Sequence, residues 1–165
     1  MKSPPTPAAS NSPCACIRLR RASRALTQLY DDVMGPSGLH LTQYALLNTI
    51  SRHGTIRITA LAAAQLLDRT ALSRNLDPLV ARGLVAVTPG RDARTREVSI
   101  TRDGETARKA ARPYWQRTQQ IVEARLGKSK LGELIELLGE VEALHPGNLT
   151  ADPAPTRGVR NARRS

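Results

Sequence analysis

Aromatic side chains are nearly absent from this 165-residue chain, which has no phenylalanine and an aromatic content of only 2%. Proteins that read single-stranded nucleic acid stack its bases on aromatic rings, so this class of protein is disfavoured. The hydrophobic content of 40% still suffices for a core, which must be built from leucine, alanine, valine and isoleucine. The length suits a single domain or a domain with tails.

Cysteines are few and long apolar runs are missing. Cys14 and Cys16 are too few and too close together to form a disulfide framework. No stretch of about 18 apolar residues is present that would span a membrane. Residues 1–13 are rich in proline, serine and alanine and contain no apolar run that would serve as a signal peptide. We therefore expect a cytoplasmic protein in a reducing compartment.

Sequence features of enzymes are missing as well. His40, His53 and His145 lie far apart, and the chain has neither a Gly-rich phosphate loop nor a metal-ligand spacing. His40 and His53 fall in the second predicted helix and its approach, where a surface or capping role is the default. We expect a protein that is not an enzyme and that needs no metal or cofactor.

Positive charge, in contrast, is abundant, with a formal net charge of +11. Four arginines against one aspartate give the last fifteen residues a net charge of +3, so most of the charge lies upstream. This balance predicts a polyanionic partner. A membrane surface is disfavoured as that partner because no predicted helix combines a basic face with a large apolar face. The alternative explanation is the arginine enrichment typical of GC-rich genomes.

The spacing of apolar residues predicts a mainly α-helical chain with a small β-hairpin. A helix over 16–34 has apolar residues at steps of three and four, namely Leu19, Ala22, Leu26, Leu29 and Val33. A second helix runs from an N-cap at Thr42 to His53 and stops at Gly54, with an inward face of Leu46, Leu47 and Ile50. Helices over about 103–126 and 128–145 follow near the C-terminus, the first of them kinked at Pro113.

The segment between these helices is the most informative part of the chain. Residues 55–58 alternate and predict a short strand, Thr59 caps a helix over 60–67, and Asp68 caps a further helix that ends at Gly83. Two antiparallel strands, 84–87 and 97–100, enclose a charged loop over 89–96. This is the layout of a winged helix-turn-helix, in which one helix enters the DNA major groove and the hairpin reaches the neighbouring minor groove.

The helix that begins after Asp68 separates apolar from polar residues. At about 100° per residue, its leucines fall on one side, with Val80 beside them. The opposite side carries the candidate DNA-binding residues Arg69, Thr70, Ser73, Arg74 and Asp77, and Asn75 lies at the border. A guanidinium can bond guanine bidentately, and hydroxyls can contact phosphates or bases. Pro78 predicts a kink, or else an end of this helix at Asp77 followed by a short segment.

The loop between the two strands supplies four further candidates for DNA binding, Arg91, Asp92, Arg94 and Arg96. The Asp92 carboxylate would hold the Arg94 guanidinium in one rotamer for the minor groove, while Arg91 and Arg96 would contact phosphates. The alternative is an exposed loop ion pair, which contributes well under ~1 kcal/mol.

The terminal helices carry more apolar surface than one small winged domain can bury. The last helix has a wide apolar stripe of Leu131, Leu134, Ile135, Leu138, Val141 and Leu144. Together with the stripe of the first helix, this surplus predicts a homodimer. The alternative is a monomer in which these helices form a cap.

Four stretches of the chain resemble the MarR family (multiple antibiotic resistance regulators) of transcription factors. They are GPSGLHLTQYALLNTI, LAAAQLLDRTALSRNLDPLVARGLV, GRDART and VSITRDGE. The resemblance implies one domain over 14–147, with dimerisation helices at about 16–34 and 103–145 and a DNA-binding lobe at about 42–101. It also implies a homodimer on a palindromic operator in double-stranded DNA, which we expect to act as a repressor until a small ligand or an oxidant releases it. By composition, 1–13 and the basic segment 148–165 are predicted to be disordered tails.

The first helix is also similar to that of the organic-hydroperoxide-sensing branch of this family. By this resemblance Cys16 is oxidised by an organic hydroperoxide and Tyr30 of the partner chain helps to hold it, since fourteen helical residues span about 21 Å. Two departures stand against the resemblance: Arg20 occupies the place of a second tyrosine, and Cys14 is the only other thiol. The alternatives are a structural Cys16 and a phenolic or other anionic effector bound near arginines such as Arg24.

A basic RNA- or ribosome-associated protein without an effector response is the rival function. The A-form major groove of RNA is too narrow for side chains to read, so such a protein has little use for a polar helix followed by an arginine hairpin. We therefore favour a sequence-specific regulator that binds double-stranded DNA.

Overall fold

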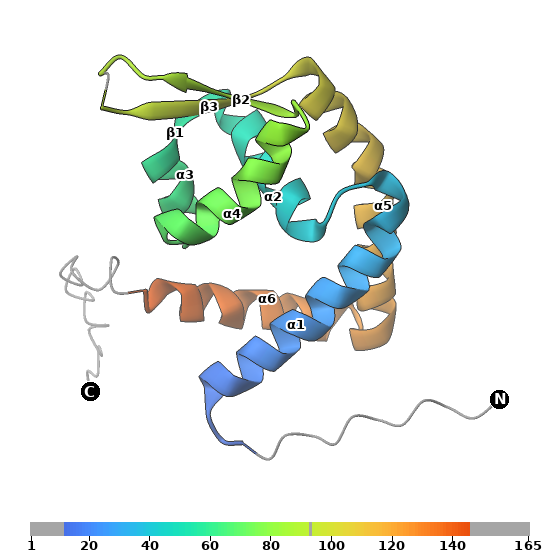
Figure 1. The fold of residues 1–165 in the computed structure, drawn as a ribbon. Coiled ribbons are helices and arrows are strands. Elements are labelled where there is room, and N and C mark those ends of the chain that lie inside the picture. The colour runs from blue at the N-terminus through green and yellow to red at the C-terminus, as the bar shows by residue number, and fades with distance from the viewer. Residues whose placement is uncertain (1–11, 93, 146–165) are drawn as a thin grey trace, which may run out of the picture. The chain divides into compact units, whose positions relative to one another are not determined.

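The computed structural model describes residues 12–92 and 94–145. Its elements, shown in Figure 1, are α1 (Ala15–Met34), η1 (Gly35–Ser37), α2 (Leu41–His53), β1 (Thr55–Arg57), α3 (Ile58–Ala64), α4 (Arg69–Ala81), β2 (Val85–Pro89), β3 (Arg96–Ile100), α5 (Arg102–Leu126) and α6 (Lys128–Ala143). This order confirms the predicted mainly α-helical fold. The chain forms two compact units, one ending at Gln120 and the other beginning at Ile121. The predicted tails at 1–13 and 148–165 fall almost entirely outside the described residues.

The sheet has three antiparallel strands in the order β1–β3–β2. The hairpin of β2 and β3 is the predicted one, and β1 adds to the other edge of β3. Val98 stands opposite Ile56 of β1 and opposite Val87 of β2. Because side chains alternate along a strand, this register gathers the apolar residues on one face, and Val98 and Ile56 are buried there. Figure 1 shows α2, α3 and α4 on one side of this sheet.

Helix α2 lies at the centre of the first unit, where it contacts α1, α4, β1 and β3. Its side chains at Leu46, Leu47 and Ile50 are at most 1% exposed, as the helical period predicted. Leu61 of α3 and the leucines of α4 complete this core. Each fully buried leucine or isoleucine contributes about 1.5–3 kcal/mol, so a core without phenylalanine still supports the fold.

Two predicted N-caps are wrong. Helix α2 begins at Leu41 rather than after Thr42, and its N-cap is His40. The His40 side chain and the Gln43 side chain cap each other's backbone N–H groups, which is a reciprocal capping box. Asp31 near the end of α1 also holds the start of α2, since its Oδ1 accepts a hydrogen bond of 2.7 Å from the Leu41 N–H.

Helix α3 begins at Ile58, directly after β1, and its N-cap is Arg57 rather than Thr59. No side-chain hydrogen bond caps this helix. The strand therefore runs into the helix without a loop, because Arg57 is also the last residue of β1 that pairs with β3. Tertiary pairing, rather than the hydroxyl of Thr59, sets the start of this helix.

Proline residues do not end the helices that contain them. Helix α4 continues through Pro78 to Ala81, and α5 continues through Pro113. The alternative in which the α4 segment ends at Asp77 is therefore wrong. Pro78 has no N–H for the carbonyl of Arg74, so the helix tolerates the loss of one internal bond.

The predicted apolar stripe of α1 is not buried within its own chain. Leu26 is 36% exposed and Ala22 is also exposed, whereas the buried residues of α1 are Tyr30 and Met34 near its end. In the second unit, α6 likewise has no buried residue. Among residues 12–92 and 94–145, no helix is long and apolar enough to cross a membrane.

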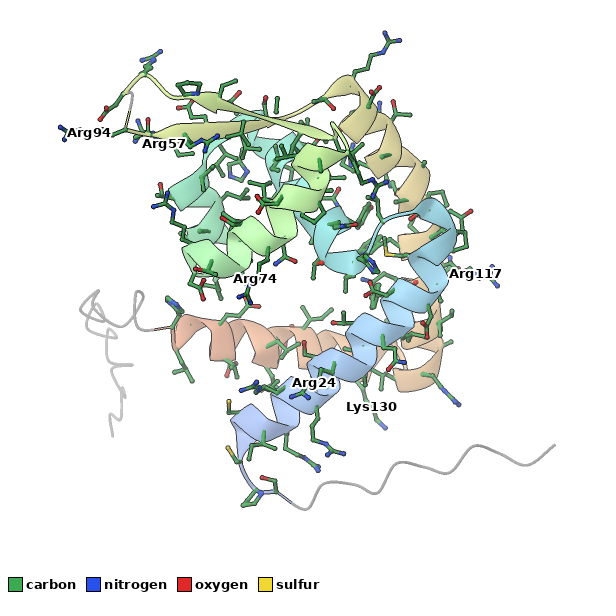
Figure 2. All side chains as sticks on the ribbon, viewed as in Figure 1. Arg24, Arg57, Arg74, Arg94, Arg117 and Lys130 are labelled. Atoms are coloured by element: carbon green, nitrogen blue, oxygen red, sulfur yellow. The ribbon has the colours of Figure 1, made fainter. Side chains whose placement is uncertain are left out.

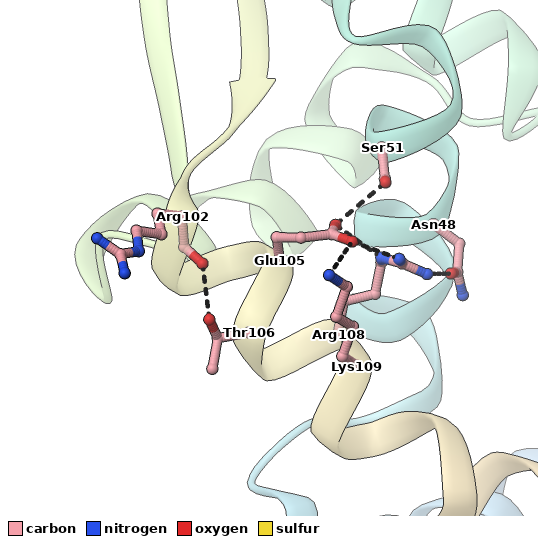
Figure 3. A network of polar contacts seen from close by, with 7 residues as sticks. All are labelled: Asn48, Ser51, Arg102, Glu105, Thr106, Arg108 and Lys109. Carbon is pink, nitrogen blue, oxygen red and sulfur yellow. Dashed lines mark hydrogen bonds and ion pairs between the residues drawn. The ribbon is translucent and has the colours of Figure 1, made fainter.

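A polar network joins α5 to α2 (Figure 3). Glu105 accepts hydrogen bonds from the Arg108 Nε at 2.9 Å and from the Ser51 hydroxyl at 3.1 Å. Arg108 also donates to the Asn48 side-chain oxygen of α2 at 3.0 Å. The hydrogen-bonded Arg108 guanidinium, helped by Ser51, holds the pKa of Glu105 at about 2, well below its ordinary value.

This lowered pKa predicts a pH-dependent contribution of Glu105 to stability. Because the folded carboxyl has the lower pKa, its contribution is fully present above about pH 4.5, the unfolded value, and is lost as the pH falls towards 2. We expect Glu105→Gln to lower the free energy of unfolding at pH 7 and to approach wild type as the medium is acidified. Denaturant titrations at several pH values measure this, with the exposed Glu140→Gln as control. A deficit of Glu105→Gln that is the same at all pH values would contradict the prediction.

Candidate nucleic-acid interface

Helix α4 presents a continuous polar face to solvent. The side chain of Asp68 caps the helix by accepting a hydrogen bond of 2.8 Å from the Ala71 N–H, as predicted. Leu72, Leu76 and Leu79 are buried, which fixes the rotation of the helix about its axis. The predicted DNA-binding residues of this helix are all exposed, namely Arg69, Thr70, Ser73, Arg74 and Asp77.

Two polar residues of α4 differ in their freedom to contact a ligand. Figure 2 shows Arg74 extending from α4 on the side away from the sheet. Asn75 instead donates its amide N–H to the Ala71 carbonyl at 2.9 Å, within its own helix. The geometry therefore favours Arg74 over Asn75 for reading bases, in line with the border position that the helical wheel gave to Asn75.

The far end of α4 is attached to the connection between α1 and α2. The Arg82 guanidinium donates a hydrogen bond of 2.8 Å to the carbonyl of Gly38. Gly38 has a positive φ of 70°, a conformation that glycine adopts without strain. This exposed bond fastens the C-terminal end of α4 to the connection between α1 and α2, while its polar N-terminal turns stay open to solvent.

The loop between β2 and β3, hereafter the wing, is held by Asp92, but not in the way the sequence predicted. Its Oδ1 accepts a hydrogen bond of 3.0 Å from the backbone N–H of Arg94, and its carbonyl accepts from the Thr95 hydroxyl at 2.7 Å. Among the described residues, no ion pair joins Asp92 to the Arg94 guanidinium. An aspartate at a turn readily bonds the backbone two residues on. Asp92 thus shapes the loop, and the guanidiniums of Arg91, Arg94 and Arg96 are exposed.

A cleft of about 410 Å³ lies between α3, the start of α4 and the wing. It brings together three predicted residues, Arg69, Arg94 and Arg96, with one that the sequence reasoning missed, Arg57. Its floor is formed by Ile58, Ala62, Ala63 and Leu67. The polar–apolar–polar alternation of Thr55, Ile56 and Arg57 was the available signal in the sequence, and the structure places Arg57 opposite the buried Ile56. We call this concavity the wing cleft.

A second cavity, of about 370 Å³, lies between α2 and α5. The rings of Tyr44 and Trp115, whose centroids are 6.1 Å apart, form its aromatic wall. Arg52, Arg108 and Arg112 also line it. Arg108 is engaged with Glu105 and Asn48, so the other two guanidiniums give this cavity its net positive charge. An aromatic wall beside arginines suits a small aromatic anion.

The candidate redox residues are not gathered in one chain. Cys14 is the N-cap residue of α1 and Cys16 lies in its first turn, and both are exposed. Tyr30 lies near the opposite end of the same helix, where it is 8% exposed. Burial raises the pKa of Tyr30. Among the described residues, no group of histidine, cysteine, aspartate or glutamate side chains is placed to hold a metal ion.

Comparisons with known proteins agree on one family. A sequence model described as MarR family matches residues 37–95. The transcriptional regulator MosR of M. tuberculosis, solved in complex with DNA, is 38% identical over 78% of this chain and 96% of its own, with a TM-score of 0.69. No curated protein matches the sequence.

Two further solved structures share the fold at lower identity. A mutant MarR from E. coli, solved with operator DNA, is 23% identical over 76% of this chain and 91% of its own, with a TM-score of 0.70. BpsR from Bordetella bronchiseptica, whose DNA binding is regulated by 6-hydroxynicotinic acid, is 22% identical over 80% of this chain and 96% of its own, with a TM-score of 0.71.

Proposed function

This chain belongs to the MarR family, and we propose that it is a transcriptional repressor that binds a palindromic operator in double-stranded DNA as a homodimer. The observation that carries the proposal is one exposed basic surface built from α4 and the wing. Arg74 extends from α4 and Arg94 from the wing of the same lobe (Figure 2). Helix α4 would enter the major groove with Arg74 on a guanine, and Arg94 would enter the adjacent minor groove.

Exposed apolar side chains support the homodimer. In α1, Ile17 is 48% exposed and Leu26 is 36% exposed. Ile135 and Leu137 of α6 and its C-cap residue Leu144 are each more than half exposed. A second copy of the chain would cover such faces, and a two-fold dimer would present two reading helices to half-sites about one helical turn apart.

Selection of genomic DNA fragments by the purified full-length protein tests this function. We expect the bound fragments to share an inverted repeat with half-sites about 10 bp apart, bound by one dimer as judged by light scattering. Single-stranded DNA and RNA of the same sequence serve as competitors. A monomer that prefers either competitor would refute the proposal and favour the RNA- or ribosome-associated alternative.

Base reading is assigned to Arg74. We expect Arg74→Ala to weaken binding to the selected operator by about 1–3 kcal/mol and to relax the preference at one base pair of each half-site. Arg94→Ala should weaken binding through the minor groove. The matched control is Arg102→Ala, which removes an exposed arginine from the start of α5, beyond the C-terminal end of β3. Unchanged base preference in Arg74→Ala, measured by repeating the selection, would mean that another residue reads the base.

Release from DNA has two candidate triggers, and the first is a small aromatic anion. The cavity between α2 and α5 supports it, because Arg112 and Arg52 stand beside the Tyr44 and Trp115 rings. We infer that an aromatic carboxylate binds there and shifts the lobe away from its DNA-binding arrangement. The second trigger is oxidation of Cys16, supported by its exposure in the first turn of α1. Its thiol would attack an organic hydroperoxide, giving a sulfenic acid and releasing the alcohol.

One experiment separates these triggers. Operator-bound protein is treated with cumene hydroperoxide or with 6-hydroxynicotinic acid, and release is followed by fluorescence anisotropy. If oxidation of Cys16 is the trigger, the peroxide should release wild type and Cys14→Ser from the operator. It should release Tyr30→Phe more weakly and leave Cys16→Ser bound. If a bound aromatic anion is the trigger, 6-hydroxynicotinic acid should release wild type from the operator and should release Arg112→Ala less readily. Release by the acid alone would leave Cys16 with a structural role.

A further inference from the structure

The wing cleft is lined by four arginines that come from β1, from α4 and from the β2–β3 hairpin. Arg57 ends β1, Arg69 begins α4, Arg94 lies in the wing and Arg96 begins β3. All four residues are exposed, and Figure 2 shows Arg57 and Arg94 at the same edge of the lobe. Pairing of β1 with β3 places Arg57 opposite Glu97, so the backbone of Arg57 lies close to that of Arg96 at the base of the wing.

The carboxylates near the cleft are directed elsewhere. Glu97 faces Arg57 across the β1–β3 pair, but no ion pair joins them among the described residues. Its Oε1 lies instead 3.3 Å from the point that a Cβ on Gly90 would occupy, on the β2 side of the wing. Asp92 bonds the Arg94 backbone, and Asp68 caps α4. Among residues 12–92 and 94–145, the four arginines of the cleft therefore have no acidic partner within it.

Four like charges around one concavity repel each other, and an anion in the cleft would relieve that repulsion. Guanidinium forks match the tetrahedral oxygens of a phosphate. The floor beside them includes the small side chains of Ala62 and Ala63, which leave room for a sugar–phosphate chain to approach. A base edge is a poorer fit, because Arg69 at the start of α4 is the residue of this helix that lines the cleft, and Arg74 does not line it.

We propose that the wing cleft binds one backbone phosphate of the operator in each half-site, and that Arg57 positions the duplex through this phosphate. The proposal rests on the DNA-binding function proposed above. Arg57 of β1, Arg69 of α4 and Arg96 of β3 then hold the same phosphate, which fixes the wing relative to the reading helix, while the Arg94 guanidinium enters the minor groove. The contact carries no sequence information, since phosphates are identical at every step.

A salt series tests the positioning role of Arg57. We expect Arg57→Ala to weaken binding about three- to tenfold on the selected operator and on a scrambled duplex alike. The slope of log affinity against log salt should become shallower by about 0.9 for each subunit bound. Arg57→Lys should retain most of the slope, and Arg102→Ala should change neither quantity. Unchanged melting temperatures would show that the variants are folded.

A neutral phosphate in the DNA locates the contact. Methylphosphonates, which carry no charge, are placed one at a time along the operator backbone. Wild type should lose affinity when one particular phosphate of each half-site is replaced. Arg57→Ala should lose no affinity at that position. If wild type binds the operator specifically and Arg57→Ala has the same affinity and the same salt slope, the phosphate assignment is overturned. The DNA-binding function would then still stand. Failure of wild type to prefer duplex DNA would overturn both. Pyrophosphate that binds wild type, but not Arg57→Ala, at constant ionic strength and without lowering the affinity of wild type for the duplex would overturn the assignment to DNA and show a site for free phosphate.

Discussion

Burial of the apolar face of α2 is the constraint on which the winged lobe depends. Leu46, Leu47 and Ile50 are at most 1% exposed, and the helix that carries them contacts α1, α4 and two strands of the sheet. The sheet in turn holds the wing, and the leucines of α4 pack into the same core. A chain without phenylalanine achieves this with close-packed aliphatic side chains, so α4 and the wing are both positioned by one apolar centre.

The basic surface depends on a different requirement, which is that its arginine side chains are not paired with carboxylates. Arg108 pairs with Glu105 and bonds Asn48 of α2, whereas no acidic residue that the structure describes lines the wing cleft. An unpaired guanidinium in water costs little in stability and is ready for an anion. The acids nearby serve the backbone instead: Asp92 shapes the wing and Asp68 caps α4. Because the acidic residues bond the backbone and the arginines stay exposed, the lobe is both stable and strongly basic.

Predictions from the sequence were correct where the interaction that determines the structure joins residues close together in the chain. The rotation of α4 follows from leucines at helical spacing and from Asp68, whose cap lies three residues from its donor. N-caps at Thr42 and Thr59 were wrong because residue type alone chose them. His40 replaces the first through a box with Gln43, and Arg57 precedes the second helix because pairing of β1 with β3 ends there. The same reliance on charge spacing misassigned Asp92, which bonds a backbone N–H instead of a guanidinium.

The amino-acid sequence by itself determined the winged order of elements, the polar face of α4 and the arginine-rich wing, because helix period, turn residues and strand alternation act over a few residues. Only the tertiary structure decided that Arg57 belongs with Arg69, Arg94 and Arg96, and that aromatic rings of α2 and α5 meet beside arginines. Those neighbours are far apart along the chain. Strand register and core packing bring them together, and these are set by many weak contacts at once.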